Sequence, residues 1–71
     1  MNHVAVKSTN IASIGYDYSL LNMVVKFKGG ALYRYDNVPP EVHAKFLNAS
    51  SPDSHFAAHI KPYFSGSKIN G

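Results

Sequence analysis

The chain has 71 residues, of which 45% are hydrophobic and 13% aromatic, so it is long enough for one small packed domain and too apolar for a disordered polypeptide. Its formal net charge of +3 is compatible with an anionic ligand but comes without the runs of Lys and Arg that are typical of nucleic-acid-binding arms. The absence of Cys excludes disulfides, thiolate nucleophiles and the common structural zinc sites.

The N-terminal part of the chain predicts extended structure interrupted by turns. Residues 1–7 contain alternating Val residues and are interpreted as a short first strand or its approach, and residues 8–10 are typical of a turn. Residues 11–18 predict a strand that Gly15 interrupts, as a bulge or a point of close backbone approach. One face of that strand would carry Ala12, Ile14 and Tyr16.

Residues 20–40 predict a β-hairpin closed near Gly29-Gly30. A two-residue turn would pair Val25 with Arg34 and place an arginine on the aliphatic face. A three-residue loop with Gly30 in the left-handed bulge position would instead pair Val25 with Tyr33. We favour the three-residue loop because it keeps one face apolar.

In that register one face of the hairpin is apolar and aromatic, with Met23, Val25, Phe27, Tyr33 and Tyr35. The outer face carries polar side chains and the apolar Val24 and Leu32, which we expect to be exposed. These two residues are candidates for a surface that another protein or protomer covers. The alternative register would turn Tyr33 and Tyr35 outward as a platform on which nucleic-acid bases could stack.

Two short helices are predicted after the hairpin. Pro39-Pro40 favours a helix over residues 41–48, with an apolar stripe of Val42, Phe46 and Ala49 that Leu47 widens. Ser51 as N-cap and Pro52 at the first helical position predict a second helix over residues 53–61. Its apolar positions would be Phe56, Ile60 and Tyr63.

The expected fold is therefore α+β, with a small antiparallel sheet of about three strands and two short C-terminal helices packed on one face. Residues 1–64 would form the single domain, and the small polar residues 65–71 would form a flexible tail.

The order and spacing of these features resemble the KTSC domain, a short module found at the C-terminus of some lysyl-tRNA synthetases and alone in bacterial and phage proteins. The matching residues are Ser8, Ile11, Ile14-Gly15-Tyr16-Asp17, Leu21, Val25, Phe27, Gly30, Tyr33, Tyr35, Val38-Pro39, Phe56, Ile60 and Tyr63. The resemblance implies a small sheet-plus-helix fold and a link to RNA or translation. Two positions depart from the expected family pattern, because Ala57 replaces an Asn and Lys61 replaces an Arg.

Cationic side chains on the hairpin suggest a binding function. Lys26, Lys28 and Arg34 could form a basic strip that contacts phosphates, with Lys61 and His59 assisting. We therefore predict a non-enzymatic binding module for a phosphate-bearing ligand, either RNA or a nucleotide, that needs no cofactor.

An alternative from another functional class stays open. The chain could be a phage-type accessory module that inhibits a host enzyme or defence complex through Val24 and Leu32, or sequesters a nucleotide as an oligomer. We expect a cytoplasmic protein with an anionic ligand or a host protein as partner and no membrane association, because no apolar stretch approaches the ~20 residues of a membrane span. The small core keeps a homo-oligomer open.

Catalytic and metal sites are not predicted. Tyr16-Asp17 places a phenol beside a carboxylate, but the pair is better interpreted as a turn in which Asp17 binds local amides. His55 and His59 have the helical spacing of a metal-binding pair, yet no third ligand lies nearby in the sequence. Gly29-Gly30 is not followed by the Lys-Ser/Thr of a phosphate loop.

Overall fold

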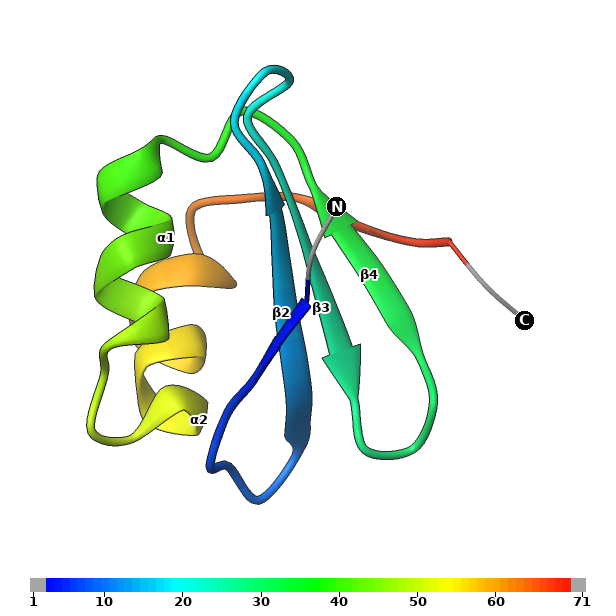
Figure 1. Cartoon of the computed structure of the whole chain (residues 1–71), viewed down its shortest axis with the longest axis vertical. Coiled ribbons are helices and arrows are strands. Elements are labelled where there is room, and N and C mark those ends of the chain that lie inside the picture. The colour runs from blue at the N-terminus through cyan, green and yellow to red at the C-terminus, as the bar shows by residue number, and fades with distance from the viewer. Residues whose placement is uncertain (1–2, 70–71) are drawn as a thin grey trace.

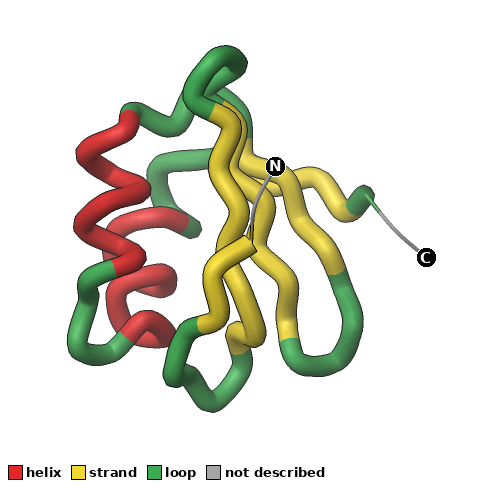
Figure 2. Tube along the Cα trace, in the orientation of Figure 1, coloured by secondary structure: helices red, strands yellow, loops and turns green. Residues whose placement is uncertain are grey.

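The structure is a computed structural model that describes residues 3–69. One antiparallel sheet is covered on one face by the helices (Figures 1 and 2). Its five strands follow chain order: β1 (His3–Ala5), β2 (Ile11–Asp17), β3 (Asn22–Phe27), β4 (Leu32–Tyr35) and β5 (Gly66–Lys68). The helical layer consists of α1 (Pro40–Leu47) and α2 (Pro52–His55), which a π-helical turn, η1 (Phe56–Ile60), continues. The α+β class is confirmed, but the sheet has five strands rather than about three.

The hairpin has the register predicted from the three-residue loop. Val25 pairs with Tyr33 and Met23 with Tyr35, and the amide of Phe27 donates to the carbonyl of Ala31 at 2.9 Å. Gly30 has a φ of 99°, a backbone conformation that residues with a Cβ atom rarely adopt. The hydrophobic period and the turn chemistry therefore agree, and the aromatic face of the hairpin points toward the helices.

The fifth strand corrects the prediction of a tail over residues 65–71. Gly66 pairs with Tyr35 and Lys68 with Tyr33, and the amide of Ile69 donates to the carbonyl of Leu32 at 2.9 Å. A Cβ atom on Gly66 would lie 2.6 Å from Cε1 of Tyr35, so only glycine lets the strand approach this ring. Residues 70–71 of the predicted tail, and residues 1–2 of the predicted first segment, lie outside the described residues.

Val24 and Leu32 are not the exposed pair that the sequence predicts. Val24 is 6% exposed, because β3 is the central strand and Val24 lies between Gly15 on β2 and Arg34 on β4. Leu32 is partly buried, since β4 has β3 on one side and β5 on the other. Pairing with a strand on each side therefore leaves β3 and β4 without the exposed apolar patch expected on the outer face.

The core lies between the sheet and the helices. Its buried members are Ile11, Ile14, Tyr16, Met23, Val25, Tyr35, Val38, Phe46 and Ile60. In β2 the register shifts between Ile11 and Ser13, so the bulge lies at Ala12 rather than at Gly15. This extra residue turns Ile11 toward the core and leaves Ala12, which the sequence assigned to that face, only partly buried.

The end of the helical layer also differs from the prediction. The second helix begins as expected, with Ser51 as N-cap and Pro52 in the first turn. From Phe56 onward it widens into a π-turn, in which the amide of Lys61 donates to the carbonyl of Phe56 at 2.9 Å. Tyr63 is 74% exposed, and Phe64 packs against the core in its place.

Candidate functional site

Two adjoining hollows lie between the β3–β4 hairpin and the second helix. The first has a volume of about 470 Å³ and extends from Asn10 and Asp53 to the hairpin loop, and the second has a volume of about 400 Å³ and extends along Tyr33 and Tyr35. Both are lined by Phe27, Phe56 and Lys61, so they form one depression. We call it the aromatic groove.

Four rings from three elements, β3, β4 and η1, line the aromatic groove. Strand alternation puts Phe27, Tyr33 and Tyr35 on the same face of the hairpin, and Phe56 opens the π-turn above them. Phe27 packs edge-to-face against Tyr33 and against Phe56, with ring centroids 5.7 Å apart in each pair. Tyr35 is buried, which raises the pKa of its phenol, whereas the other three rings stay partly exposed. The groove therefore offers accessible aromatic surface.

Two of the predicted cationic residues line this groove. Lys28 comes from the hairpin loop and Lys61 from the residue after η1, and both side chains are exposed. Among residues 3–69 neither lysine forms an ion pair. Their ammonium groups are therefore free to meet an anion beside the aromatic floor.

The other predicted ligand-binding residues lie elsewhere. Lys26 and Arg34 alternate with the core residues of their strands and so point to the opposite face of the sheet, where Arg34 pairs with Asp36 at 3.1 Å. His59 lines a separate hollow with His55, whose ring is 4.7 Å away between centroids. The structure thus divides the predicted basic strip and joins Lys28 with Lys61, which are far apart in the sequence.

Asp53 is the acidic side chain of the aromatic groove, and its carboxylate is directed to the loop before β2. It accepts hydrogen bonds from the hydroxyl of Ser8 at 2.7 Å and from the amide of Thr9 at 2.9 Å. These hydrogen bonds lower the pKa of the Asp53 carboxyl, and the bond from Ser8 makes the largest contribution. Sequence reasoning placed Asp53 only in the first helical turn, because no local pattern links residues 45 positions apart.

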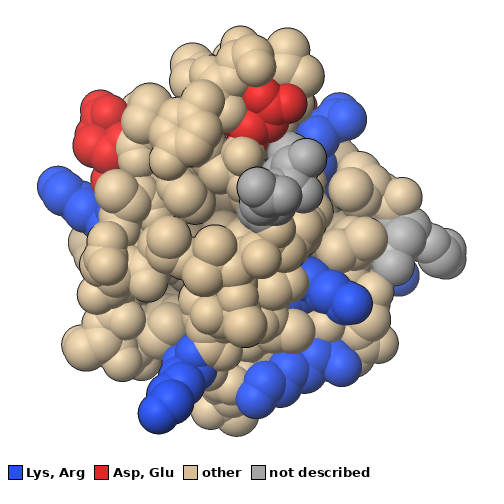
Figure 3. Space-filling model, in the orientation of Figure 1, with Lys and Arg blue, Asp and Glu red and all other residues tan. Residues whose placement is uncertain are grey.

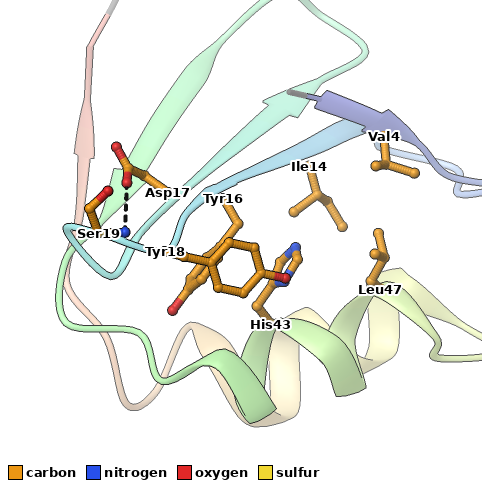
Figure 4. A pocket seen from close by; sticks show the side chains of 8 residues that line it. All are labelled: Val4, Ile14, Tyr16, Asp17, Tyr18, Ser19, His43 and Leu47. Atoms are coloured by element: carbon orange, nitrogen blue, oxygen red, sulfur yellow. Dashed lines mark hydrogen bonds between the residues drawn. The ribbon is translucent and has the colours of Figure 1, made fainter. Parts of the chain in front are cut away.

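A third hollow, of about 560 Å³, lies on the other side of the helical layer between β1, β2 and α1 (Figure 4). Tyr16 stacks on His43 with centroids 4.4 Å apart and planes at 12°, and Tyr18 meets Tyr16 edge-on at 4.7 Å. Ile14, Val4 and Leu47 complete its apolar side, while Asp17 and Ser19 lie at the opposite end. We call this hollow the tyrosine pocket.

The turn interpretation of Tyr16-Asp17 is confirmed. Asp17 accepts hydrogen bonds from the amides of Ser19 at 2.9 Å and Leu20 at 3.3 Å, and the contact with Ser19 lowers its pKa. The hydroxyl of Tyr16 donates to the carbonyl of Val38, and burial raises its pKa. Both groups therefore hold the fold together at this end of the sheet.

His43 is a buried residue of the tyrosine pocket that the sequence analysis did not identify. It is 7% exposed, burial lowers its pKa, and within the described structure its Nδ1 atom has no hydrogen-bond partner. The only signal in the sequence was that His43 directly follows Val42, a residue of the predicted apolar stripe.

The comparisons with known proteins support the resemblance seen in the sequence. The model of the KTSC domain matches residues 7–64. The chain belongs to the KTSC domain family. An uncharacterized protein of Stutzerimonas stutzeri is 45% identical over 62 residues, covering 87% of each chain. A protein of Tsukamurella paurometabola is 39% identical over 59 residues, covering 83% of this chain and 88% of the relative.

A solved structure shows the same architecture. The crystal structure of a KTSC domain protein from Yersinia pestis superposes with a TM-score of 0.90 at 34% identity and covers 97% of both chains. This likeness covers nearly the whole of both chains and so extends beyond the residues 7–64 that the family model matches.

Ala57 and Lys61, the two departures noted in the sequence, both line the aromatic groove. In the part of the chain that the structure describes, no helix is long and apolar enough to cross a membrane. Within residues 3–69, no group of three or more His, Asp or Glu side chains could hold a metal ion.

Proposed function

We propose that this KTSC domain is a non-enzymatic binding module for a nucleotide or a short single-stranded RNA, held in the aromatic groove. The observation that supports the proposal is that Lys28 and Lys61, whose ammonium groups form no ion pair among the described residues, line the same hollow as partly exposed aromatic rings. Rings and cations at one place match the two parts of a nucleotide, because bases stack on aromatic side chains and phosphates attract cations.

The dimensions of the groove suit such a ligand. Each of its hollows, of about 470 and 400 Å³, falls within the range of small-molecule sites. Phe27, Tyr33 and Phe56 are half-buried, so each has a fixed orientation and still offers surface to a base. Stacking of one base on such a ring contributes about 1–3 kcal/mol.

The charges of the groove favour a phosphate at its Lys28 end. The carboxylate of Asp53 is engaged by Ser8 and Thr9, so its lone pairs are directed to the loop and not to the lysines. Arg34 is less suited to a phosphate, because it already pairs with Asp36. We therefore assign phosphate contact to Lys28 and Lys61 and give Lys26, Arg34 and His59 no direct contact.

Titration of the labelled protein with adenosine monophosphate and with a short oligouridylate, followed by amide NMR shifts, tests the proposal. We expect shifts at Lys28, Phe56 and Lys61, and affinity that falls steeply with salt. The double variant Lys28→Ala, Lys61→Ala should weaken binding by about tenfold or more, since each lost phosphate contact removes a charge-assisted interaction.

The matched control is the double variant Lys26→Ala, Arg34→Ala, which removes the same charge from the opposite face. It should keep nearly full affinity. Equal losses in both double variants would show that only net charge attracts the ligand, and the groove would then not be the site. Preference for the oligouridylate over the mononucleotide would identify RNA as the ligand class.

The alternative function, a protein-interaction module acting on a host enzyme or defence complex, loses the surface first assigned to it. Val24 is buried and Leu32 is partly buried, so neither presents an apolar patch to a partner. Such a module would need another contact surface.

A further inference from the structure

We propose that the tyrosine pocket is a second ligand site, which binds a small organic amine in its ammonium form. It lies apart from the aromatic groove, has no lining residue in common with it and differs from it in charge. The inference does not depend on the proposed binding of nucleotides.

One ring of the pocket is open to a cation, because Tyr18 is 68% exposed, whereas Tyr16 and His43 stack on each other and are each 7% exposed. Tyr16 and His43 are stacked, and Tyr18 stands at 81° to Tyr16 and at 90° to His43, with centroid distances of 4.7 and 6.3 Å. Figure 4 shows the three rings together in the middle of the pocket, with Ile14 and Leu47 on the side away from Asp17. A cation within about 6 Å of a ring centroid is attracted by the electron density of the ring face.

The charge of the pocket favours a cation over an anion. Asp17 is one of its lining residues, and none of the lining residues in the described part of the chain is Lys or Arg. After burial, the largest influences that raise the pKa of the Tyr16 phenol are Tyr18, Glu41 and Asp17. The face of the molecule that Figure 3 shows carries both acidic and basic side chains.

His43 supplies an independent indication of a ligand. The side chain is more than nine-tenths buried, lines the pocket and has an Nδ1 atom without a partner among residues 3–69. A buried polar atom left unpaired costs about 1–3 kcal/mol, so such atoms commonly have a role. Burial keeps the imidazole neutral, and a neutral ring nitrogen can accept a proton donor of an ammonium group.

The apolar side of the pocket defines the rest of the ligand. Val4, Ile14 and Leu47 lie opposite Asp17 and Ser19 along the cavity of about 560 Å³. An alkyl chain of a few carbons would pack against them while the ammonium group lies among the rings and Asp17. The ligand class is therefore a primary amine with a short apolar chain.

The test compares n-butylammonium with the uncharged 1-butanol by amide NMR titration of the full chain. We expect n-butylammonium to shift the amides of Tyr16, Tyr18 and His43 and to bind at least about fivefold more tightly than the alcohol. Equal binding of the two probes, or an absence of localised shifts with the amine, would overturn the proposal.

Two variants test which side chains contribute to the binding of n-butylammonium. Tyr18→Leu removes one ring at a position that is 68% exposed and should weaken n-butylammonium about threefold, and Glu41→Gln should weaken it by a smaller factor. Lys28→Ala, in the aromatic groove, should leave the amine affinity unchanged. Unchanged affinity in Tyr18→Leu and Glu41→Gln together would contradict an aromatic cation site.

Discussion

The aromatic groove and the tyrosine pocket flank the same pair of helices, and both have rings from the core-facing side of the sheet as their walls. They differ in charge, because Lys28 and Lys61 line the groove whereas Asp17 lies in the pocket with Glu41 nearby. The fold thus supplies aromatic surface on both sides of the helical layer. The charged residues lie at the margin, in a loop and at the ends of strands and helices, and our two proposals assign each hollow its ligand class from these charges.

The largest expected effect concerns the helical layer that separates the two hollows. Phe46 is fully buried on α1, stacks on His55 at 5.8 Å and contacts Phe56 of the aromatic groove at 5.9 Å. Phe46→Ala should lower the free energy of unfolding by about 3–5 kcal/mol, measured by urea denaturation. The exposed Tyr63→Ala is the control and should change it by less than about 0.5 kcal/mol. Comparable losses in the two variants would mean that Phe46 does not support the core.

A smaller effect should disturb the aromatic groove and leave the tyrosine pocket intact. In Gly66→Ala the new Cβ would lie 2.6 Å from the ring of Tyr35, so β5 or the ring must move, at a cost of about 1–3 kcal/mol. Amide exchange should increase at Ile69, whose bond to Leu32 holds the edge strand.

Gly29→Ala is the matched control for that variant, because no atom lies within 4 Å of a Cβ at Gly29. It should change stability by less than about 0.5 kcal/mol. If Gly66→Ala proved equally harmless, β5 would not be packed against Tyr35 in solution.

The next prediction disturbs the tyrosine pocket alone. His43→Phe keeps a stacked ring beside Tyr16 and removes the unpaired Nδ1, so at neutral pH the free energy of unfolding should rise by about 1 kcal/mol. Such a gain would show that the natural histidine is retained at a cost to stability.

The pH dependence of stability provides a second readout at His43. Burial lowers the folded-state pKa below the unfolded value of 6.5, so the unfolded chain binds the proton more readily. Stability should therefore fall as the pH drops below about 6.5, until the folded-state pKa is reached. In urea titrations between pH 7 and 5, His43→Phe should remove much of this fall. Identical pH profiles for the two proteins would mean that His43 does not titrate differently on folding.

The hairpin could be predicted from sequence because its information is local. Alternation of Met23, Val25 and Phe27 and the glycine loop specify both the faces and the register, and the structure has both. The edge strand β5 could not be predicted from sequence, because Gly-Ser-Lys has little strand preference. It becomes a strand only because β4 offers it backbone partners. Val24 was wrongly expected on the surface for another reason: both neighbouring strands were predicted, but strand alternation does not show how closely they cover a side chain between them.

The candidate sites were less predictable than the fold. Lys28 and Lys61 were both named from sequence, but their meeting depends on how the π-turn places the second helix against the hairpin loop. The lysines and arginine of the hairpin were grouped together, although strand alternation puts Lys26 and Arg34 on the face opposite Phe27. The partners of Asp53 and the burial of His43 are tertiary contacts, for which local patterns carry little signal.

The smallest expected effect is a change in nucleotide affinity when a residue of the aromatic groove is replaced. Ala57 and Lys61 replace the Asn and Arg expected of the family, and both line the first hollow of the groove. Lys61→Arg should tighten nucleotide binding about two- to fivefold, because a planar guanidinium can bind a phosphate through two hydrogen bonds and stack on a ring. Calorimetric titration with adenosine monophosphate measures the change. Lys45→Arg, an exposed substitution on α1, is the control and should have no effect. Weaker binding by Lys61→Arg would indicate that this position needs a compact point charge, and the phosphate would then lie closer to the groove floor than a guanidinium allows.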